Sequence, residues 1–182
     1  MVEKVELTDG RILLRPYRSE DAERLFEAAT ESIAELLPWM DWCLPGYSID
    51  ESRTWVAKQD EVWRKGTDYN FSIVDRVDDS YLGGCGLNHF DLENKFCSLG
   101  YWVRTSRTKH GTATASARLL AQFAFQQLAL LRVNIVEAVD NKTSQRVAEK
   151  AGALREGVLR NVSFYHNRTH DMVMFSLIPG DL

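Results

Sequence analysis

Residues 108–113, Thr-Lys-His-Gly-Thr-Ala, place polar side chains, one glycine and small residues directly before an alanine-rich amphipathic run. A helix that begins on small side chains keeps its first backbone N–H groups open, and these groups carry partial positive charge. Such a helix start can bind a phosphate. The sequence has no G-x-x-x-x-G-K-[ST] motif, and the glycines of 83–86 lie in a strand-like run, so neither common nucleotide motif explains the loop. By itself, the loop is equally typical of an ordinary connection between a strand and a helix.

A second group of residues with chemical potential is the pair His166 and His170, which has Asp171 beside it. A four-residue spacing of histidines on a helix is typical of a metal site. Here the pair brackets an expected hairpin turn, so we expect no metal site. Three cysteines are present, an odd number without C-x-x-C spacing, and buried free thiols are the expected state of Cys43, Cys85 and Cys97.

The composition is that of a globular protein with one core. The chain has 182 residues, 45% of them hydrophobic and 26% charged, which predicts a single domain over 1–182. The net charge of −4 argues against a sequence-wide attraction to nucleic acid. No apolar run of about 18 residues occurs, and the N-terminus lacks the apolar centre of a signal peptide. We therefore expect a cytoplasmic protein that does not bind membranes.

The elements that must position the phosphate loop follow from hydrophobic periodicity and capping signals. Three strand-like runs at 69–77, 81–90 and 96–103 are joined by short turns, which favours an antiparallel meander. The remaining expected elements are a strand at 11–18, a helix over 19–31 capped by Ser19, a helix over 49–65 with a Ser48–Glu51 capping box and a stop at Gly66, a helix from Ala113 to about Ala129, a strand at 132–139, a short helix after Asn141 that ends at Gly152, and two strands around the turn Asn167–Thr169.

This order of elements predicts the fold class. Strands and helices alternate in part, so we expect an α/β (α+β) protein with a mixed, mostly antiparallel central sheet of about seven strands flanked by helices. The β–α–β unit over 98–139 should pair its two strands in parallel through a right-handed crossover. Residues 31–47 contain too many turn-forming residues for one long helix.

Several segments together resemble one family. They are ILLRPYRSEDAERLF near the start, LGYWV before the phosphate loop, FAFQQLALLRVNIVEAVDN and NKTSQRVAEKAGA after it, and LREGVLRN and HDMVMFSL at the end. Jointly they resemble the GNAT acetyltransferases, in the branch of the RimJ/RimL-type ribosomal-protein N-acetyltransferases, over roughly residues 8–178. The resemblance implies the acyl-CoA N-acyltransferase fold.

The resemblance also implies acetyl-CoA as cosubstrate, without a metal. In the family a [QR]-x-x-G-x-[GA] loop holds the pyrophosphate with backbone N–H groups. Thr108 stands here at the Gln/Arg position, and Lys109 can add positive charge. The strand that ends the LGYWV segment matches the strand that pairs with the pantetheine arm, and a backbone N–H near 102–103 could polarise the thioester carbonyl. The implied cofactor-binding residues are Tyr101, Trp102, Val103, Thr108, Lys109, His110, Gly111, Thr112, Ala113 and Asn141.

The catalytic groups depart from the family pattern. Many members place a tyrosine seven residues after the asparagine to protonate the leaving thiolate, and this chain has Ala148 there. Ser144 is our candidate acid, with a structural role at the helix start as the alternative. Ser98 replaces a glutamate that in relatives acts as a base or holds its water, so His89 and Tyr165 are the candidate bases.

The expected reaction is acetyl transfer to a primary amine, most simply the N-terminal amine of a ribosomal protein, by direct attack in a ternary complex. The alternatives are a small amine acceptor (an antibiotic, an amino acid or a polyamine) and a non-catalytic acyl-CoA-binding module. We expect a homodimer, as is common in this branch. The acceptor site is expected to be lined by Trp39, Met40, Trp42, Tyr47 and the sheet edge, and the alternative for these aromatic residues is a packed core.

Overall fold

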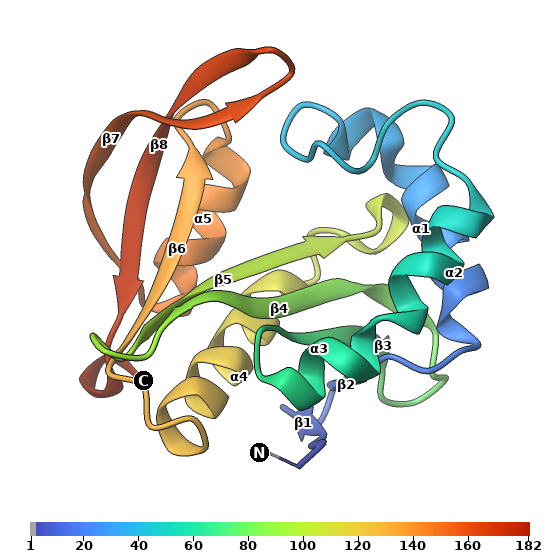
Figure 1. Cartoon of the computed structure of the whole chain (residues 1–182), viewed down its shortest axis with the longest axis horizontal. Helices are drawn as coiled ribbons and strands as arrows, with labels where there is room; N and C mark the ends of the chain where they lie inside the picture. Colours follow the sequence, from blue (N-terminus) through green and yellow to red (C-terminus); the bar gives the residue numbers. More distant parts are fainter. Residues whose placement is uncertain (1–2) are drawn as a thin grey trace.

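The computed structural model describes residues 3–182, which form a mixed sheet with helices on both faces (Figure 1). The strands are β1 (Leu7–Thr8), β2 (Ile12–Pro16), β3 (Tyr69–Asp75), β4 (Tyr81–Asp91), β5 (Phe96–Val103), β6 (Arg132–Ala138), β7 (Leu154–Tyr165) and β8 (Arg168–Leu177). The α-helices are α1 (Asp21–Leu36), α2 (Ile49–Ala57), α3 (Gln59–Lys65), α4 (Thr112–Gln126) and α5 (Lys142–Ala151).

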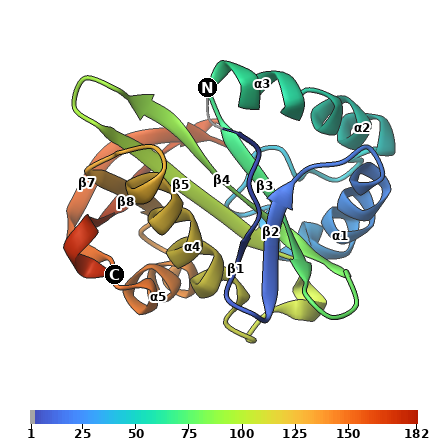
Figure 2. The same ribbon diagram turned by 90° about the horizontal axis from the view of Figure 1, so that it is seen from below.

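The sheet has the strand order β1-β2-β3-β4-β5-β6-β8-β7. Neighbouring strands are antiparallel except β5 and β6, which pair in parallel across the α4 crossover. The expected meander and β–α–β unit are therefore confirmed. Within residues 3–182 the sheet has eight strands, in agreement with the expected mixed, mostly antiparallel sheet of about seven. The additional strand is the two-residue β1, which is too short to show periodicity and pairs with β2. Helices α1, α2 and α3 lie on one side of the sheet, and α4 and α5 lie on the other (Figure 2).

The main core lies between the sheet and α4. Helix α4 turns an alanine-rich face toward the strands, with Ala117, Leu120, Ala121 and Ala124 fully buried, and small side chains let the helix approach the sheet closely. Phe123 of the same helix packs edge-on against Phe71 of β3, with ring centroids 5.7 Å apart. Thr112 and Ser116 in the first turns of α4 are also buried, so the core holds the helix start at the predicted phosphate loop, residues 108–113.

Strands β5 and β6 separate soon after they meet. Their parallel pairs are Phe96 with Arg132, Cys97 with Val133 and Ser98 with Asn134, and the pairing ends there. β5 runs on beside β4 as far as the pair Gly83–Val103. β6 turns instead toward β8, so the two strands diverge as a V (Figure 1). A strand edge free of its sheet neighbour is what the expected pantetheine contact requires.

Local predictions in the first half of the chain are corrected in part. Ser19 does not cap the first helix: α1 has Glu20 at its N-cap position and no side-chain cap. The carboxylate of Asp21 instead accepts a hydrogen bond from the Arg18 N–H at 2.8 Å. Helix α1 continues to Leu36, past the expected end near residue 31, because its buried face extends through Ser32 and Leu36.

The helix expected over 49–65 is two helices, α2 and α3, which meet at Lys58. The Ser48–Glu51 capping box and the left-handed stop at Gly66 are confirmed at its two ends. At the other end of the chain, the turn between β7 and β8 is formed by His166 and Asn167, both with positive φ. It therefore begins one residue earlier than predicted.

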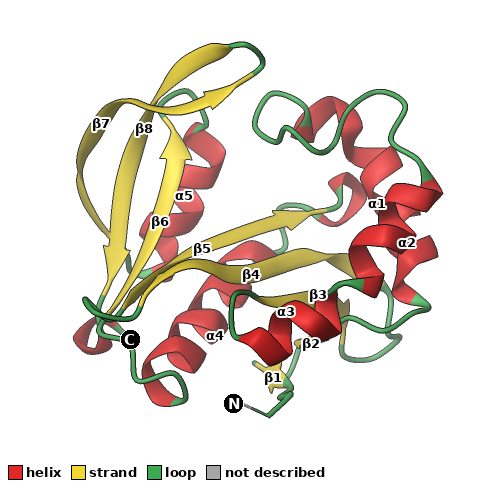
Figure 3. Cartoon of the chain, viewed as in Figure 1, coloured by secondary structure: helices red, strands yellow, loops and turns green. Residues whose placement is uncertain are grey.

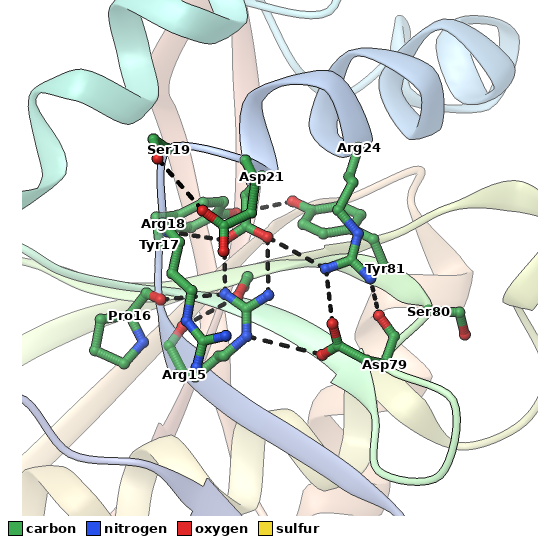
Figure 4. A network of polar contacts seen from close by, with 12 residues as sticks. Arg15, Pro16, Tyr17, Arg18, Ser19, Asp21, Arg24, Asp79, Ser80 and Tyr81 are labelled. Carbon is green, nitrogen blue, oxygen red and sulfur yellow. Dashed lines mark hydrogen bonds and ion pairs between the residues drawn. The ribbon is translucent and has the colours of Figure 1, made fainter.

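A buried ion pair joins β2 to α1 (Figure 4). Arg15 donates to the two carboxylate oxygens of Asp21 at 2.6 and 2.8 Å, and both side chains are almost completely inaccessible to solvent. Arg24 and Asp79 extend the network at the surface, with a nitrogen–oxygen distance of 3.2 Å. The pair fixes the path of the chain between β2 and α1.

Helix α1 also anchors the segment that leads from β5 to the phosphate loop. The Thr105 N–H donates to the Ser32 hydroxyl at 3.0 Å, and the Ser106 N–H donates to Glu31 at 2.7 Å. The guanidinium of Arg104 also binds Glu31, and this hydrogen bond lowers the pKa of that carboxyl to about 2. The loop is thus attached to a helix from the other side of the sheet.

Candidate active site

The loop before α4 has the geometry of an anion site. Gly111 is the N-cap residue with φ +76, and Lys109 is also left-handed with φ +67. No side chain caps α4, and its first turn contains no acidic residue. The first N–H groups of the helix, at Thr112 and Ala113, are therefore left for an anion. Thr108, at the Gln/Arg position of the family motif, donates its hydroxyl to the Thr105 carbonyl at 2.9 Å and shapes the turn.

Arg11 contacts this loop, which the sequence did not indicate. Its guanidinium donates to the carbonyl of His110, 99 residues away in the chain. It also lies 3.7 Å from the position that a Cβ on Gly111 would take. The family motif has a long side chain at position 108 where this chain has threonine, and Arg11 places a positive charge against the same turn. The signal was absent from the local sequence because Arg11 lies immediately before β2, far from the loop in the chain.

The edge of β5 beyond Ser98 carries the next predicted residues. Trp102 pairs with Gly84 of β4, and Val103 pairs with Gly83, so only the edge that faces away from β4 is open to a ligand. Across the V, the side-chain carbonyl of Asn141 accepts a hydrogen bond from the Ser144 N–H at 3.1 Å. Asn141 thus caps α5 in the short connection that follows β6.

Ser144 and Tyr101 meet across the divergence of β5 and β6. The Ser144 hydroxyl donates to the Tyr101 phenol oxygen at 3.0 Å, and the phenol lies 3.1 Å from the Ser144 carbonyl, to which it donates. Burial raises the pKa of Tyr101 far above its usual range. Tyr101, which the sequence indicated only as a cofactor-binding residue, therefore places an un-ionised hydroxyl beside the candidate acid.

A cavity of about 510 Å³ opens beside this strand edge on the α1–α2 side of the sheet. Trp102 of β5 lies in its wall and packs edge-on against Trp42, with centroids 5.6 Å apart. The cavity depends on Gly84, because a Cβ there would lie 2.6 Å from the Tyr17 hydroxyl and 2.8 Å from the Trp102 ring nitrogen. The aromatic residues that line the cavity are Tyr17, Trp42, Tyr47, Trp55, Tyr101 and Trp102.

The charged residues that line this cavity are acidic. Asp41 and Glu51 contribute carboxylates, and the lining includes no lysine or arginine among the described residues. Of the four residues expected around the acceptor, Met40, Trp42 and Tyr47 line the cavity, and Trp39 does not. An aromatic cavity with carboxylates at its wall can accommodate an apolar group that carries a positively charged amine.

The two candidate bases lie apart from this cavity. His89 is exposed on β4, with φ +48, and the neighbouring Asn88 lines the cavity in its place. Tyr165 lies near the tip of the β7–β8 hairpin, where its ring stacks on His170 with centroids 3.6 Å apart. The hairpin faces the loop after α1 (Figure 3), and the His166 Nε2 lies 2.7 Å from the Leu37 carbonyl oxygen. Neither candidate is in contact with Ser144.

Residues 3–182 contain neither a metal-binding cluster nor a membrane-spanning helix. No cluster of three or more histidine, cysteine, aspartate or glutamate side chains there could hold a metal ion. Within the same part of the chain, no helix has the length and apolar character needed to cross a bilayer. Cys43, Cys85 and Cys97 are buried free thiols, as the sequence predicted.

Comparisons with known proteins agree with this geometry. The chain is 32% identical over 172 residues to the "Putative ribosomal N-acetyltransferase YdaF" of Bacillus subtilis strain 168, covering 93% of this chain and 92% of that protein. Two solved structures share the fold at 22% identity. The microcin C7 self-immunity acetyltransferase MccE, in complex with acetyl-CoA and AMP, has a TM-score of 0.86 over 94% of this chain and 93% of that one. RimL, the ribosomal L7/L12 α-N-protein acetyltransferase, in complex with coenzyme A, has a TM-score of 0.85 over 97% and 98%.

The family model described as the acetyltransferase (GNAT) domain matches residues 11–154, which include the phosphate loop, the divergent strands and Ser144. The match covers most of the chain and every element of the site except the β7–β8 hairpin beyond residue 154. The chain therefore belongs to the GNAT family of acetyltransferases.

Proposed function

We propose that this protein transfers the acetyl group of acetyl-CoA to the N-terminal amine of a protein. The observation that carries the proposal is the end of the β5–β6 pairing at Ser98–Asn134. The resulting gap lies between the open start of α4 and the aromatic cavity, with Tyr101 and Ser144 at its sides. A cosubstrate with a pyrophosphate at one end and a thioester at the other fits this arrangement.

The residues around the gap between β5 and β6 have separate roles in the proposed reaction. The N–H groups at the start of α4, with Arg11 and Lys109 nearby, hold the pyrophosphate. The free edge of β5 near Trp102 orients the pantetheine arm and the thioester carbonyl. Acetyl-CoA supplies the activated acyl group, and Ser144 gives a proton to the sulfur that leaves. Asn141 holds the first turn of α5, and with it Ser144, in position.

The cavity supports a peptide acceptor. Its volume of about 510 Å³ exceeds the need of a simple amine, and its aromatic wall would take an apolar side chain next to the amine. The names of YdaF and RimL both refer to ribosomal substrates. Homodimer formation and a cytoplasmic location stay predictions from the sequence.

The acceptor is tested by thiol release from acetyl-CoA with a panel of amines. We expect short peptides with a free N-terminus and an apolar first residue to give a kcat/KM at least tenfold above polyamines and aminoglycosides, about 1.4 kcal/mol of discrimination. The same peptides with a blocked N-terminus should be inactive, and mass spectrometry should locate the acetyl group on the α-amine. Preference for a small amine would refute the peptide acceptor. Absence of turnover with every amine would favour the acyl-CoA-binding module.

The phosphate loop is tested by Gly111→Asp. The new carboxylate would stand against the bound phosphates at the start of α4, so acetyl-CoA affinity should fall at least tenfold, about 1.4 kcal/mol, by calorimetry. Gly66→Asp is the matched control, because Gly66 is also left-handed, with φ +68, and lies at the end of α3. This control should change thermal stability and leave affinity unchanged. Unaltered affinity in a folded Gly111→Asp protein would exclude the loop as the phosphate site.

A further inference from the structure

Glu137 is a half-buried acidic residue at the point where β5 and β6 have separated. Tyr101 and Glu137 each lie three residues beyond the last β5–β6 pair, Ser98 with Asn134. Glu137 interacts there with the hydroxyls of Tyr101 and Ser144. These are the two hydroxyls that bond to each other at 3.0 Å. Three proton-carrying groups from β5, β6 and α5 therefore meet at one place.

No cation accompanies this carboxyl group. Tyr101 faces it from β5 and Ser144 from α5, and Val173 is its apolar partner in the register of β8. Among residues 3–182, no lysine, arginine or histidine forms an ion pair with Glu137, whereas the fully buried carboxylate of Asp21 is paired with Arg15. Burial raises the pKa of Glu137 to about 7, against the smaller opposing effect of the two hydroxyls. A substantial fraction of Glu137 is therefore protonated at neutral pH.

We propose that Glu137 holds the proton that Ser144 delivers to the departing sulfur. The inference rests on the role proposed above for Ser144. The neutral amine nitrogen of the acceptor forms a bond to the acetyl carbonyl carbon and releases one proton to water. As the carbon–sulfur bond then breaks with its electron pair on sulfur, Ser144 gives its hydroxyl proton to the sulfur. Glu137 gives its carboxyl proton to the Ser144 oxygen, and water later returns a proton to the carboxylate. Glu137 is thus a positioning and proton-supplying residue that acts through Ser144.

The chemistry of Ser144 requires such a partner. A serine hydroxyl is a weak acid, and its proton is replaced efficiently only if a group with a pKa near the working pH lies beside it. Ala148 occupies the position of the family tyrosine, and its buried methyl side chain has no acidic proton to donate. An unpaired carboxyl with a perturbed pKa in a site of this kind is typical of a functional group.

The pH dependence of kcat tests the proposal. At saturating acetyl-CoA and acceptor, kcat of the unmodified enzyme should decrease above about pH 7 as Glu137 ionises. Glu137→Gln keeps the shape and hydrogen bonding but holds no acidic proton. We expect its kcat at pH 6.5 to be about tenfold lower, the decrease near pH 7 to disappear and the KM for acetyl-CoA to stay within twofold. Glu137→Asp should restore the decrease with pH.

Glu149→Gln is the matched control, because Glu149 is an exposed glutamate of α5 and the same charge is removed. It should keep the unmodified kcat and pH profile. A readout independent of turnover is the 13C resonance of the glutamate carboxyls, where one signal should titrate near pH 7 and be missing in Glu137→Gln. Ordinary titration of Glu137 near pH 4, or a Glu137→Gln enzyme with unchanged kcat and pH profile, would overturn the proposal.

The two proposals fail in different ways. Any amine that the enzyme acetylates reports the pH profile, so rejection of the peptide acceptor leaves the role of Glu137 intact. A Ser144→Ala enzyme with full turnover would overturn the proton path from Glu137 even if the peptide acceptor were correct.

Discussion

Asp21→Asn should lower the free energy of unfolding by about 3–5 kcal/mol, because it leaves the buried charge of Arg15 with only its longer, 4.0 Å ion pair to the surface residue Asp79. Asp21 is fully buried and accepts two hydrogen bonds from the Arg15 guanidinium and one from the Arg18 N–H. Figure 4 shows these bonds at the junction between β2 and α1. Urea unfolding at pH 7 measures the loss. Glu23→Gln is the control, since Glu23 forms an exposed ion pair with Arg53 and should change stability by less than about 1 kcal/mol.

The same substitution predicts a pH dependence. Burial acts to raise the pKa of Asp21, but the bonds and charge of Arg15 and the Arg18 N–H outweigh it, so that the pKa is lowered from 3.8. A carboxyl with a lowered pKa stabilises the fold fully above its unfolded value and loses this contribution as the pH falls through the folded value. The unmodified protein and Asp21→Asn should therefore differ most above pH 4 and converge in stronger acid. A difference below about 1 kcal/mol in the free energy of unfolding at pH 7 would contradict the stabilising contribution expected of the Arg15–Asp21 ion pair.

Ser144→Ala should lower kcat by roughly 10–100-fold at saturating acetyl-CoA, since it removes the proton donor from the divergent strands. We expect the low end of the range for general acids because a thiol is a fair leaving group without help. The affinity for acetyl-CoA should change little, because Asn141 still caps α5 through the backbone N–H of residue 144. Steady-state kinetics separates the two quantities.

The alternative role of Ser144 is structural, and thermal unfolding distinguishes it. Loss of the hydroxyl bond to Tyr101 should cost about 1 kcal/mol of stability, while Tyr101 keeps its bond to the backbone carbonyl. Thr143→Ala provides the control, because Thr143 is an exposed hydroxyl residue in the same turn of α5. If Ser144→Ala is less stable yet turns over normally, Ser144 has only the structural role.

The sequence determined the features that depend on residues close together in the chain. The capping box at Ser48 and Glu51, the stop at Gly66 and the cap at Asn141 are set by contacts over three or four residues. For the same reason Ser144 could be placed in the first turn of α5. The apolar stripe of α4 and the short turns of the meander likewise indicated the main elements, because periodicity is itself a local property.

Local signals were insufficient where packing outweighed them. The turn-forming residues after Glu31 suggested an early end of α1, but burial of Leu36 extends the helix. The two-residue strand β1 has no periodicity and exists only through its pairing with β2. Ser19 is a good capping residue, yet the pairing of Asp21 with buried Arg15 decides the geometry at that helix start.

Only the tertiary structure brought Arg11 to the phosphate loop and Glu137 to the two hydroxyls. Arg11 precedes His110 by 99 residues, and no pattern within a segment relates them. Glu137 and Tyr101 lie on the two strands just beyond the end of the β5–β6 pairing, and Ser144 comes to them because α5 packs on β6. Registers and packing follow from the sum of many core contacts, so these meetings of distant side chains are decided by the assembled core and not by any one segment.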